Sequence, residues 1–338
     1  MKSVFLCSNL DMINKVYSDL VKIELNTNAG LEIVKVYTID DITKNENIFC
    51  DIECIFSTWN MPQFVEEDIK KYFPRLKAIF YAAGTVKYFA KPFLNLGIRI
   101  YSAKEANSIP VAEFVVSQII LANKGYFQSQ LKYKRSFFKK GFRAANKISQ
   151  LKPGNYKSSV GIIGAGSVGR RVILLLKSYD INTFVYDPFL SDKEIDNLKC
   201  KRKSLEEIFR TCDVISNHLP DIDSTKGILD YQLFSRMNDN ATFINTGRGF
   251  QVIEKDLVKV LREKPGVCAI LDVTKHEPVF PLHPFKTRKN VFVSPHIAGS
   301  QNSEQLRMGE LMLEAYKAYS NSIESTHEIK IDDLPNRA

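Results

Sequence analysis

The feature that most constrains the fold of this chain is a glycine-rich segment near its middle, directly after a short apolar run. Gly164, Gly166 and Gly169 have the spacing Gly-x-Gly-x-x-Gly, with a strand predicted over 159–163 and a helix over 168–178. Gly164 permits a tight turn, Gly166 lets the backbone approach a ligand, and Gly169 lets the helix pack close to the sheet. Unpaired N–H groups at a helix start attract phosphate groups. The segment therefore predicts a binding site for the pyrophosphate of a dinucleotide.

An acidic residue lies where this pattern requires one, at the end of the next predicted strand, 183–186. Asp187 can accept hydrogen bonds from the ribose hydroxyls of the adenosine half, and it would repel a 2′-phosphate. It is followed by Pro188, Phe189 and Leu190 rather than by an arginine. Alone, an aspartate here could be a simple turn residue, but in this context it favours NAD over NADP.

Predicted strands and helices alternate along most of the chain, which is typical of parallel sheets covered by helices on both faces. A length of 338 residues indicates two domains of this kind. Pro110 is expected in the first turn of a long helix over 111–124, and Ser204 with Glu207 predicts a capping box. The last dozen residues are expected to be loosely held. The other predicted helices cover 12–21, 65–72 and 303–320, and the other strands cover 3–7, 52–57, 76–82, 98–101, 214–217, 241–245, 267–271 and 291–294.

Three polar side chains follow three of these strands, at the edge where such sheets bind ligands. Arg248 can hold a carboxylate through its planar fork, His296 titrates in the range useful for proton transfer, and Glu277 can orient an imidazole. Individually, each has a simpler interpretation as a surface ion-pair partner, a loop residue or a turn residue. Together they predict hydride transfer at C2 of a small 2-hydroxy or 2-keto acid.

The positive charge of the chain is concentrated in one stretch. Between Glu113 and Asp180 there are 13 lysines and arginines and no acidic residue, which accounts for the whole net charge of +9. The densest part, 132–143, also contains Tyr133, Phe137, Phe138 and Phe142. This stretch is either an electropositive surface for anions or nucleic acid, or a solvated arm or subunit contact, which we favour.

Other protein classes are not indicated. The hydrophobic fraction of 44% and the charged fraction of 25% are ordinary for a soluble globular protein. Apolar runs are too short for a signal peptide or a membrane span, so we expect a cytoplasmic protein without membrane contacts. The six cysteines lack the usual zinc-site spacings, so reduced thiols and no metal site are expected.

These segments, in this order, resemble the D-isomer-specific 2-hydroxyacid dehydrogenases. The resemblance covers roughly 76–303 and rests on four motifs. They are Asn245-Thr246-Gly247-Arg248-Gly249, Asp272 followed by Glu277, Pro295-His296 with Gly299, and Asn107-Ser108 before Val111-Ala112-Glu113.

The resemblance implies two doubly wound α/β domains, with an NAD-binding Rossmann domain (109–302) inserted in a discontinuous flavodoxin-like substrate domain (1–108 and 303–338). It implies a homodimer formed through the cofactor domain, with the basic stretch near the contact. We expect no nucleic-acid partner. Arg248, Glu277 and His296 would be catalytic, and Gly84, Thr85 and Asn107 would bind substrate. The implied NAD-binding residues are Gly164, Gly166, Ser167, Val168, Gly169, Asp187, Pro220, Thr246, Asp272 and Gly299.

The chain also departs from the family pattern. Lys87-Tyr88-Phe89 replaces a common Gly-x-Asp-Asn continuation, and the loop 56–62 lacks the arginine of phosphoglycerate-using relatives. We also expect no regulatory domain after residue 338. Trp59 and Met61 would form an apolar wall for a substrate with an uncharged C3 group, and His276 replaces a residue that is often acidic. Two alternatives stay open: an NAD-responsive interaction protein similar to the family's corepressor relatives, and a phosphite- or formate-type dehydrogenase.

Overall fold

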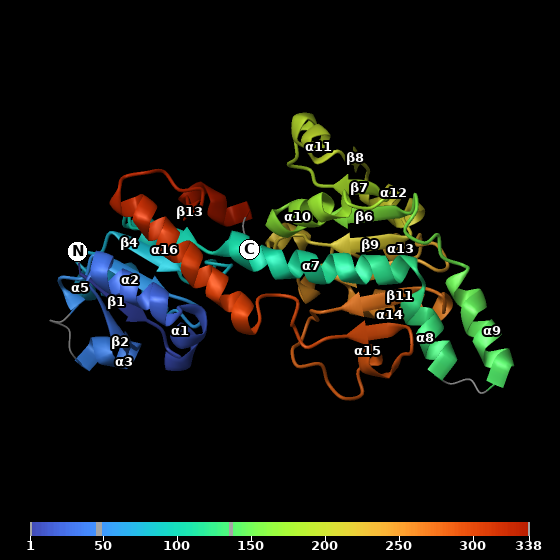
Figure 1. Ribbon diagram of the computed structural model, residues 1–338, viewed down its shortest axis with the longest axis horizontal. Coiled ribbons are helices and arrows are strands. Elements are labelled where there is room, and N and C mark those ends of the chain that lie inside the picture. The colour runs from blue at the N-terminus through green and yellow to red at the C-terminus, as the bar shows by residue number, and fades with distance from the viewer. Residues whose placement is uncertain (1, 45–48, 135–137, 337–338) are drawn as a thin grey trace. The chain divides into compact units, whose positions relative to one another are not determined.

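The structure is a computed structural model that describes residues 2–44, 49–134 and 138–336, and its contacts divide the chain into two units (Figure 1). The first unit combines Met1–Asn107 with Ser300–Ala338, and the second is Ser108–Gly299. Among the described residues, no helix is both long enough and apolar enough to cross a membrane.

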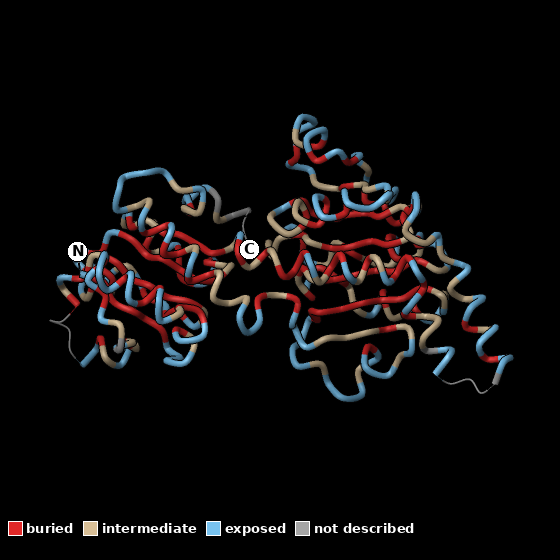
Figure 2. Tube along the Cα trace, viewed as in Figure 1, coloured by how far each residue is buried: buried red, intermediate tan, exposed pale blue. Residues whose placement is uncertain are grey.

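The first unit is built on a sheet whose order, across the residues described, is β13-β5-β4-β3-β1-β2. All neighbours in it are parallel except β13, which pairs antiparallel with β5. The central strands are buried on both faces (Figure 2), as their continuous apolar sequences require. The strands are β1 (Ser3–Leu6), β2 (Leu31–Tyr37), β3 (Cys54–Ser57), β4 (Ala78–Tyr81), β5 (Arg99–Ser102) and β13 (Glu328–Ile329).

The helix predicted over 12–21 is wrong, because two helices share this segment. The backbone is extended at Tyr17, and the Ser18 hydroxyl accepts a hydrogen bond from the Val21 N–H, which starts a new helix. Tyr17 is fully buried in this break and donates to the carbonyl of Ser57. The helices of this unit are α1 (Leu10–Val16), α2 (Asp19–Ala29), α3 (Ile39–Lys44), α5 (Glu66–Tyr72), α6 (Ala90–Asn95) and α16 (Leu306–Ser320), with 3₁₀ turns η3 (Asn302–Gln305) and η4 (Ile331–Asn336).

The end of the chain is held more firmly than expected. Glu328 and Ile329 add β13 to the sheet beside β5, and the Glu328 carboxylate receives a two-pronged ion pair from Arg99. Ile329 is buried in the core of the first unit. The expectation of a loose last dozen residues is therefore wrong for this strand.

The second unit contains a fully parallel sheet, with the order β12-β11-β10-β9-β6-β7-β8 in the part of the chain that the structure describes. Every strand predicted for this region is present within one or two residues. The strands are β6 (Ser159–Ile163), β7 (Asn182–Tyr186), β8 (Lys201–Arg202), β9 (Val214–Asn217), β10 (Thr242–Asn245), β11 (Cys268–Leu271) and β12 (Val291–Val293).

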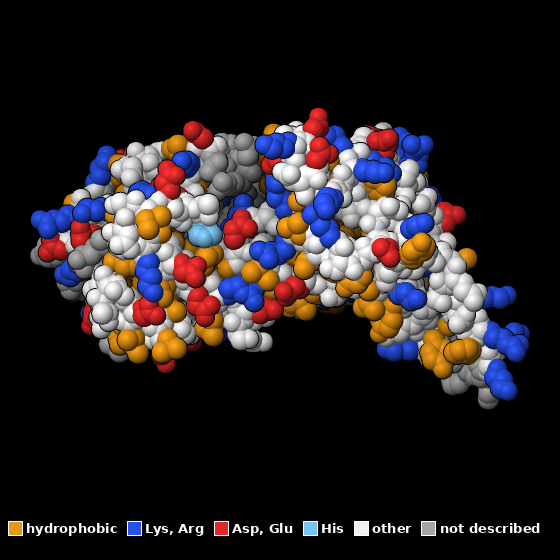
Figure 3. Space-filling model, turned by 45° about the horizontal axis from the view of Figure 1, so that its top comes forward, with side chains coloured by type: hydrophobic (Ala, Val, Ile, Leu, Met, Phe, Trp, Pro, Cys, Tyr) orange, Lys and Arg blue, Asp and Glu red, His pale blue; other side chains and the backbone are white. Residues whose placement is uncertain are grey.

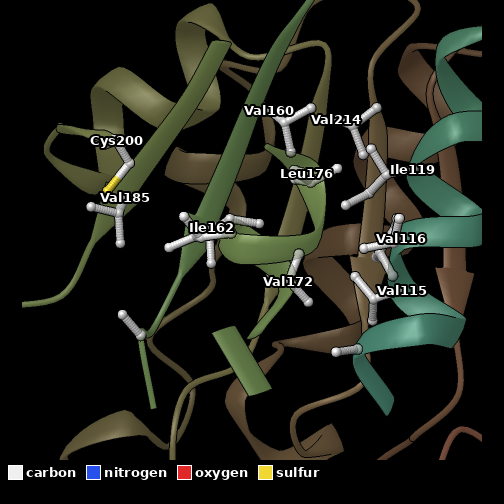
Figure 4. Packing of buried hydrophobic residues seen from close by; sticks show 14 of the residues in the cluster. Val115, Val116, Ile119, Val160, Ile162, Val172, Leu176, Val185, Cys200 and Val214 are labelled. Carbon is white, nitrogen blue, oxygen red and sulfur yellow. The ribbon is translucent and has the colours of Figure 1, made fainter. Parts of the chain in front are cut away.

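The helix α7 (Lys104–Asn123) crosses the boundary between the units and packs in the second unit against β6 and β9. Figure 4 shows its Val115, Val116 and Ile119 facing Val160 and Val214 across this core. Pro110 lies inside α7 rather than in its first turn, because the helix begins six residues earlier, where the Ser102 hydroxyl accepts the Lys104 N–H.

The remaining helices of the second unit cover the sheet and carry the predicted caps. Ser204 and Glu207 form the predicted capping box at the start of α12. The helices are α8 (Tyr126–Lys134), α9 (Phe138–Ser149), α10 (Ser167–Leu176), α11 (Asp192–Leu198), α12 (Leu205–Thr211), α13 (Tyr231–Phe234), α14 (Glu254–Glu263) and α15 (Pro284–Thr287), with 3₁₀ turns η1 (Asp223–Thr225) and η2 (Gly249–Gln251).

The basic stretch forms an arm of two helices, α8 and α9, that extends from the sheet of the second unit (Figure 1). Lysine and arginine side chains gather along it beside exposed apolar ones (Figure 3), and Tyr133 and Phe142 pack edge to face while each stays more than half exposed. Phe137 and the other residues of 135–137 lie outside the described residues.

Candidate active site

The glycine-rich loop between β6 and α10 has the geometry that its sequence predicts. Gly164 has φ +86°, and a Cβ there would lie 2.8 Å from the backbone oxygen of His218. A Cβ on Gly169 would lie 2.0 Å from the oxygen of Gly164, whereas one on Gly166 would meet open space. Gly166 caps α10 without a side-chain hydrogen bond. The loop thus leaves room and helix N–H groups for a pyrophosphate, which is the fit that a dinucleotide requires.

Asp187 connects this loop to the end of β7. One carboxylate oxygen accepts the N–H of Ala165 at 2.7 Å, and the other accepts the N–H of Phe189 at 2.9 Å. The side chain therefore fixes the glycine loop against the neighbouring strand. Its predicted contact with ribose hydroxyls stays a prediction.

Three neighbouring strands bring the predicted catalytic residues to one edge of the sheet. Arg248 follows β10, Glu277 follows β11 and His296 follows β12, and these strands are paired in register. A Cβ on Gly249 would lie 2.0 Å from the backbone carbon of Thr274, so the first two loops are in close backbone contact. Only glycine permits this approach directly after the arginine.

His296 and Glu277 form a hydrogen-bonded pair. The imidazole Nδ1 lies 2.8 Å from Glu277 Oε2, and Oε1 of the same carboxylate accepts the Thr274 N–H at 3.1 Å. His296 has φ +55°, a left-handed conformation that is uncommon for a residue with a side chain. Its side chain is 52% exposed, so the other ring nitrogen can reach a ligand. This arrangement allows general acid–base chemistry with an oriented imidazole.

The loop that carries His296 is held by Asp272. Its two carboxylate oxygens accept hydrogen bonds from the Ser294 hydroxyl at 2.6 Å and from the N–H groups of Ile297 and Ala298, both at 2.9 Å. Asp272 was expected to bind cofactor. That role stays a prediction, and its contacts show that it also positions the loop of His296.

The guanidinium of Arg248 is partly exposed at the same edge. One terminal nitrogen donates to the Gly247 carbonyl at 2.8 Å, and Nε lies 4.0 Å from a carboxylate oxygen of Asp221. The arginine can therefore present its remaining donors to a carboxylate ligand.

The backbone of Arg248 is held by a network of three buried amide side chains, of which the sequence motifs named only Asn245. Gln251 Oε1 accepts the Arg248 N–H at 3.1 Å, and the Asn245 amide donates to the Arg248 carbonyl at 3.3 Å. The Asn217 amide donates to Gln251 Oε1 at 2.6 Å and to Asn245 Oδ1 at 3.0 Å. All three amides are at most 1% exposed. Their position at the strand ends was the available signal, because buried amides must be paired.

Sequence reasoning also missed His218, although it lies two residues before Pro220, which was expected to bind cofactor. Its ring nitrogens lie 2.9 Å from the Ser216 hydroxyl and 3.3 Å from that of Thr246. Desolvation by burial lowers the pKa of His218 to about 3, so the ring is neutral near pH 7. Its neighbour Thr246 was expected to bind cofactor, and His218 links it to β9.

The predicted substrate residues lie in the first unit. The Ser102 hydroxyl donates to the Gly84 carbonyl at 2.6 Å, and the Thr85 hydroxyl accepts a backbone N–H two residues further along. Asn107 Oδ1 accepts the N–H of Ser300 at 3.1 Å. Met61 of the expected apolar wall is only 8% exposed and belongs to the core of this unit, whereas Trp59 is partly buried.

The other residues expected to bind cofactor lie in the second unit, in segments that follow β6, β9 and β12. Ser167 and Val168 open α10, Pro220 follows β9, and Gly299 ends the His296 loop.

Within the described ranges, no cluster of histidine, cysteine or carboxylate side chains could hold a metal ion.

The loop and the strand-end residues together define an α/β protein that binds a dinucleotide. Residues 121–298, more than half of the chain, match the NAD-binding domain of the D-isomer specific 2-hydroxyacid dehydrogenases. The chain belongs to this family, which confirms the resemblance, the fold class and NAD as the cofactor.

Similar proteins span several substrates. A glyoxylate reductase of Aeropyrum pernix is 35% identical over 48% of this chain and 48% of its own length. A D-3-phosphoglycerate dehydrogenase of Haemophilus influenzae is 28% identical over 74% of this chain and 60% of its own length. The chain thus spans about half the length of the curated relatives it matches. The solved structure of Rhodotorula graminis D-mandelate dehydrogenase has a TM-score of 0.79 and 16% identity, with 97% of each chain covered, and supports the fold.

Proposed function

We propose that this chain is an NAD-dependent oxidoreductase that interconverts a small 2-keto acid and the D-2-hydroxy acid. The observation that carries the proposal is the 2.8 Å contact between His296 and Glu277, which follow β12 and β11, and β11 pairs with β10, the strand that Arg248 follows. The glycine loop for the dinucleotide opens from β6 of the same sheet. A cation, an oriented imidazole and a dinucleotide site are what the reaction requires.

Each residue then has one role in the reduction. NADH, when bound, would supply a hydride to C2 of the keto acid. Arg248 binds the substrate carboxylate and polarises the neighbouring carbonyl. His296, protonated and oriented by Glu277, gives its proton to the C2 oxygen as the C=O double bond becomes a C–OH single bond. In the oxidation direction, His296 removes the hydroxyl proton.

We propose that the first unit is the substrate domain, with Gly84, Thr85 and Asn107 as binding residues, and that the substrate carries an uncharged C3 group. The loop beside Trp59 supports this because residues 56–62 include no arginine for a phosphate.

The test is the rate of NADH oxidation by the purified chain with glyoxylate, pyruvate, 2-oxobutyrate, phenylpyruvate, hydroxypyruvate and its phosphorylated form. NADPH is assayed in parallel. We expect turnover with NADH and uncharged side groups. Fastest turnover with the phosphorylated acid would contradict the substrate class, and no turnover with any acid would contradict the activity.

The arm of α8 and α9 supports two further proposals. Tyr133 and Phe142 are 55% and 56% exposed beside several lysines, which suits a contact with a second copy of the chain. We propose a homodimer that uses this arm.

The alternative function, an NAD-responsive interaction protein, would use the same surface. Light scattering tests the dimer, and salt-dependent binding of a labelled DNA duplex without keto-acid turnover would favour the alternative.

A further inference from the structure

A carboxylate stands beside the arginine of the candidate site, and the proposed reaction does not use it. Asp221 follows β9 by four residues, and its Oδ2 lies 4.0 Å from Arg248 Nε. The Asp221 side chain is 19% exposed and that of Arg248 is 35% exposed. Two opposite charges at this depth are screened less than a surface pair.

The position of Asp221 is fixed by the same amide that fixes Arg248. Gln251 Oε1 accepts the Arg248 N–H, while its Nε2 donates to the carbonyls of Leu219 and Pro220 at 2.8 Å and 2.9 Å. One buried side chain therefore holds the backbone of the arginine and the two residues that precede the aspartate.

The far side of Asp221 is held as well. The Thr225 hydroxyl donates to the carbonyls of Pro220 and Ile222, at 2.7 Å and 2.9 Å. The backbone on both sides of Asp221 is thus held by hydrogen bonds, which anchor the residue beside Arg248.

A fixed negative charge beside a carboxylate-binding arginine has a specific consequence. A ligand with one carboxylate can take the free donors of Arg248 and leave Asp221 near the guanidinium. A ligand with a second negative group adds repulsion from Asp221, whereas Arg248 is already engaged by the first carboxylate. A plain ion pair without this role would affect all anionic ligands alike.

We propose that Asp221 is a specificity-determining residue that restricts the site to 2-keto and 2-hydroxy acids with a single negative charge. The inference rests on the proposed function, since it assigns the charge class of the substrate that Arg248 binds. The absence of an arginine from residues 56–62 already argues against a phosphorylated substrate. Asp221, which lies in the second unit, is an independent reason to expect a substrate without a second negative charge.

The first experiment compares 2-oxovalerate and 2-oxoglutarate, which have chains of equal length and differ in one terminal carboxylate. In Asp221→Asn we expect kcat/KM for 2-oxoglutarate to rise about tenfold, with 2-oxovalerate changed by less than about twofold. The matched control is Asp223→Asn, which removes the same charge from the same loop at a side chain that is 94% exposed. Equal effects on both substrates, or an equal gain in the control, would overturn the inference.

A second experiment needs no turnover. Oxamate and oxalate have nearly the same shape and carry one and two negative charges, and calorimetry gives their Kd for the NADH-loaded protein. We expect Asp221→Asn to strengthen oxalate binding about tenfold relative to oxamate. Failure of the relative gain overturns the role of Asp221. Absence of turnover with a clear relative gain would instead overturn the proposed dehydrogenase activity and keep the charge selectivity.

Discussion

At the residue scale, the backbone that carries the charged side chains of the site is held by hydrogen bonds to buried amides and to a carboxylate. Arg248 is held through its backbone by Gln251 and Asn245, and the loop of His296 is held by Asp272. The sequence predicted the arginine and the histidine because their chemistry is distinctive. It named Asn245 only as part of a motif and did not predict Gln251 or Asn217, because an amide is informative only once its burial between strands is known.

The role of His296 is tested by His296→Ala. We expect kcat to fall by a factor of about 10² to 10⁴, because general acid catalysis is lost, with NADH binding nearly unchanged. Stopped-flow turnover and fluorescence titration of NADH measure the two effects. His276→Ala, an exposed histidine in the loop of Glu277, is the control. If NADH affinity fell together with kcat, the assignment of His296 would be wrong.

His218 predicts a pH effect on stability. Burial lowers its pKa from 6.5 to about 3, so the unfolded chain takes up a proton first as the pH falls. The contribution of the neutral ring to the free energy of unfolding is complete above pH 6.5. Below that pH it decreases, by about 2 kcal/mol at pH 5. Urea unfolding of the wild type and of His218→Gln, at pH 5 and above pH 6.5, measures this change in the free energy of unfolding. A wild-type loss no larger than that of the variant would contradict the prediction.

At the scale of elements, patterns with strong local signals were predicted well. Every predicted strand is present within one or two residues, and the capping box of α12 is confirmed. The edge strand β2 was missed because Glu32 and Lys35 interrupt its apolar residues. The two-residue β13 was missed because it exists only through its pairing with β5.

The glycine loop offers a matched pair of substitutions. Gly169→Ala forces a Cβ to 2.0 Å from the Gly164 oxygen, so we expect a loss of about 1–3 kcal/mol in stability. Gly166→Ala meets no protein atom, so stability should hold while the methyl group weakens NADH binding about tenfold or more. Thermal unfolding and NADH titration separate the two. Intact NADH binding in Gly166→Ala would place the pyrophosphate elsewhere.

At the scale of the whole molecule, the two α/β units follow from alternating strands and helices, whose parallel sheets need helices on both faces. The basic arm was recognised as a charged stretch, but its two-helix form was not predicted. It depends in part on a contact between the helices, of Tyr133 in α8 with Phe142 in α9. Polar residues at strand ends of one sheet are brought together by topology alone, which is why the catalytic residues could be proposed before the fold was known.

The most direct test of the account follows the hydride. The chain is incubated with a 2-keto acid and NADH that carries deuterium at the transferable position of the nicotinamide ring. We predict that deuterium appears at C2 of the product, that the product is the D isomer by chiral chromatography, and that His296→Ala yields almost none. Unlabelled product, the L isomer, or undiminished transfer in His296→Ala would contradict it.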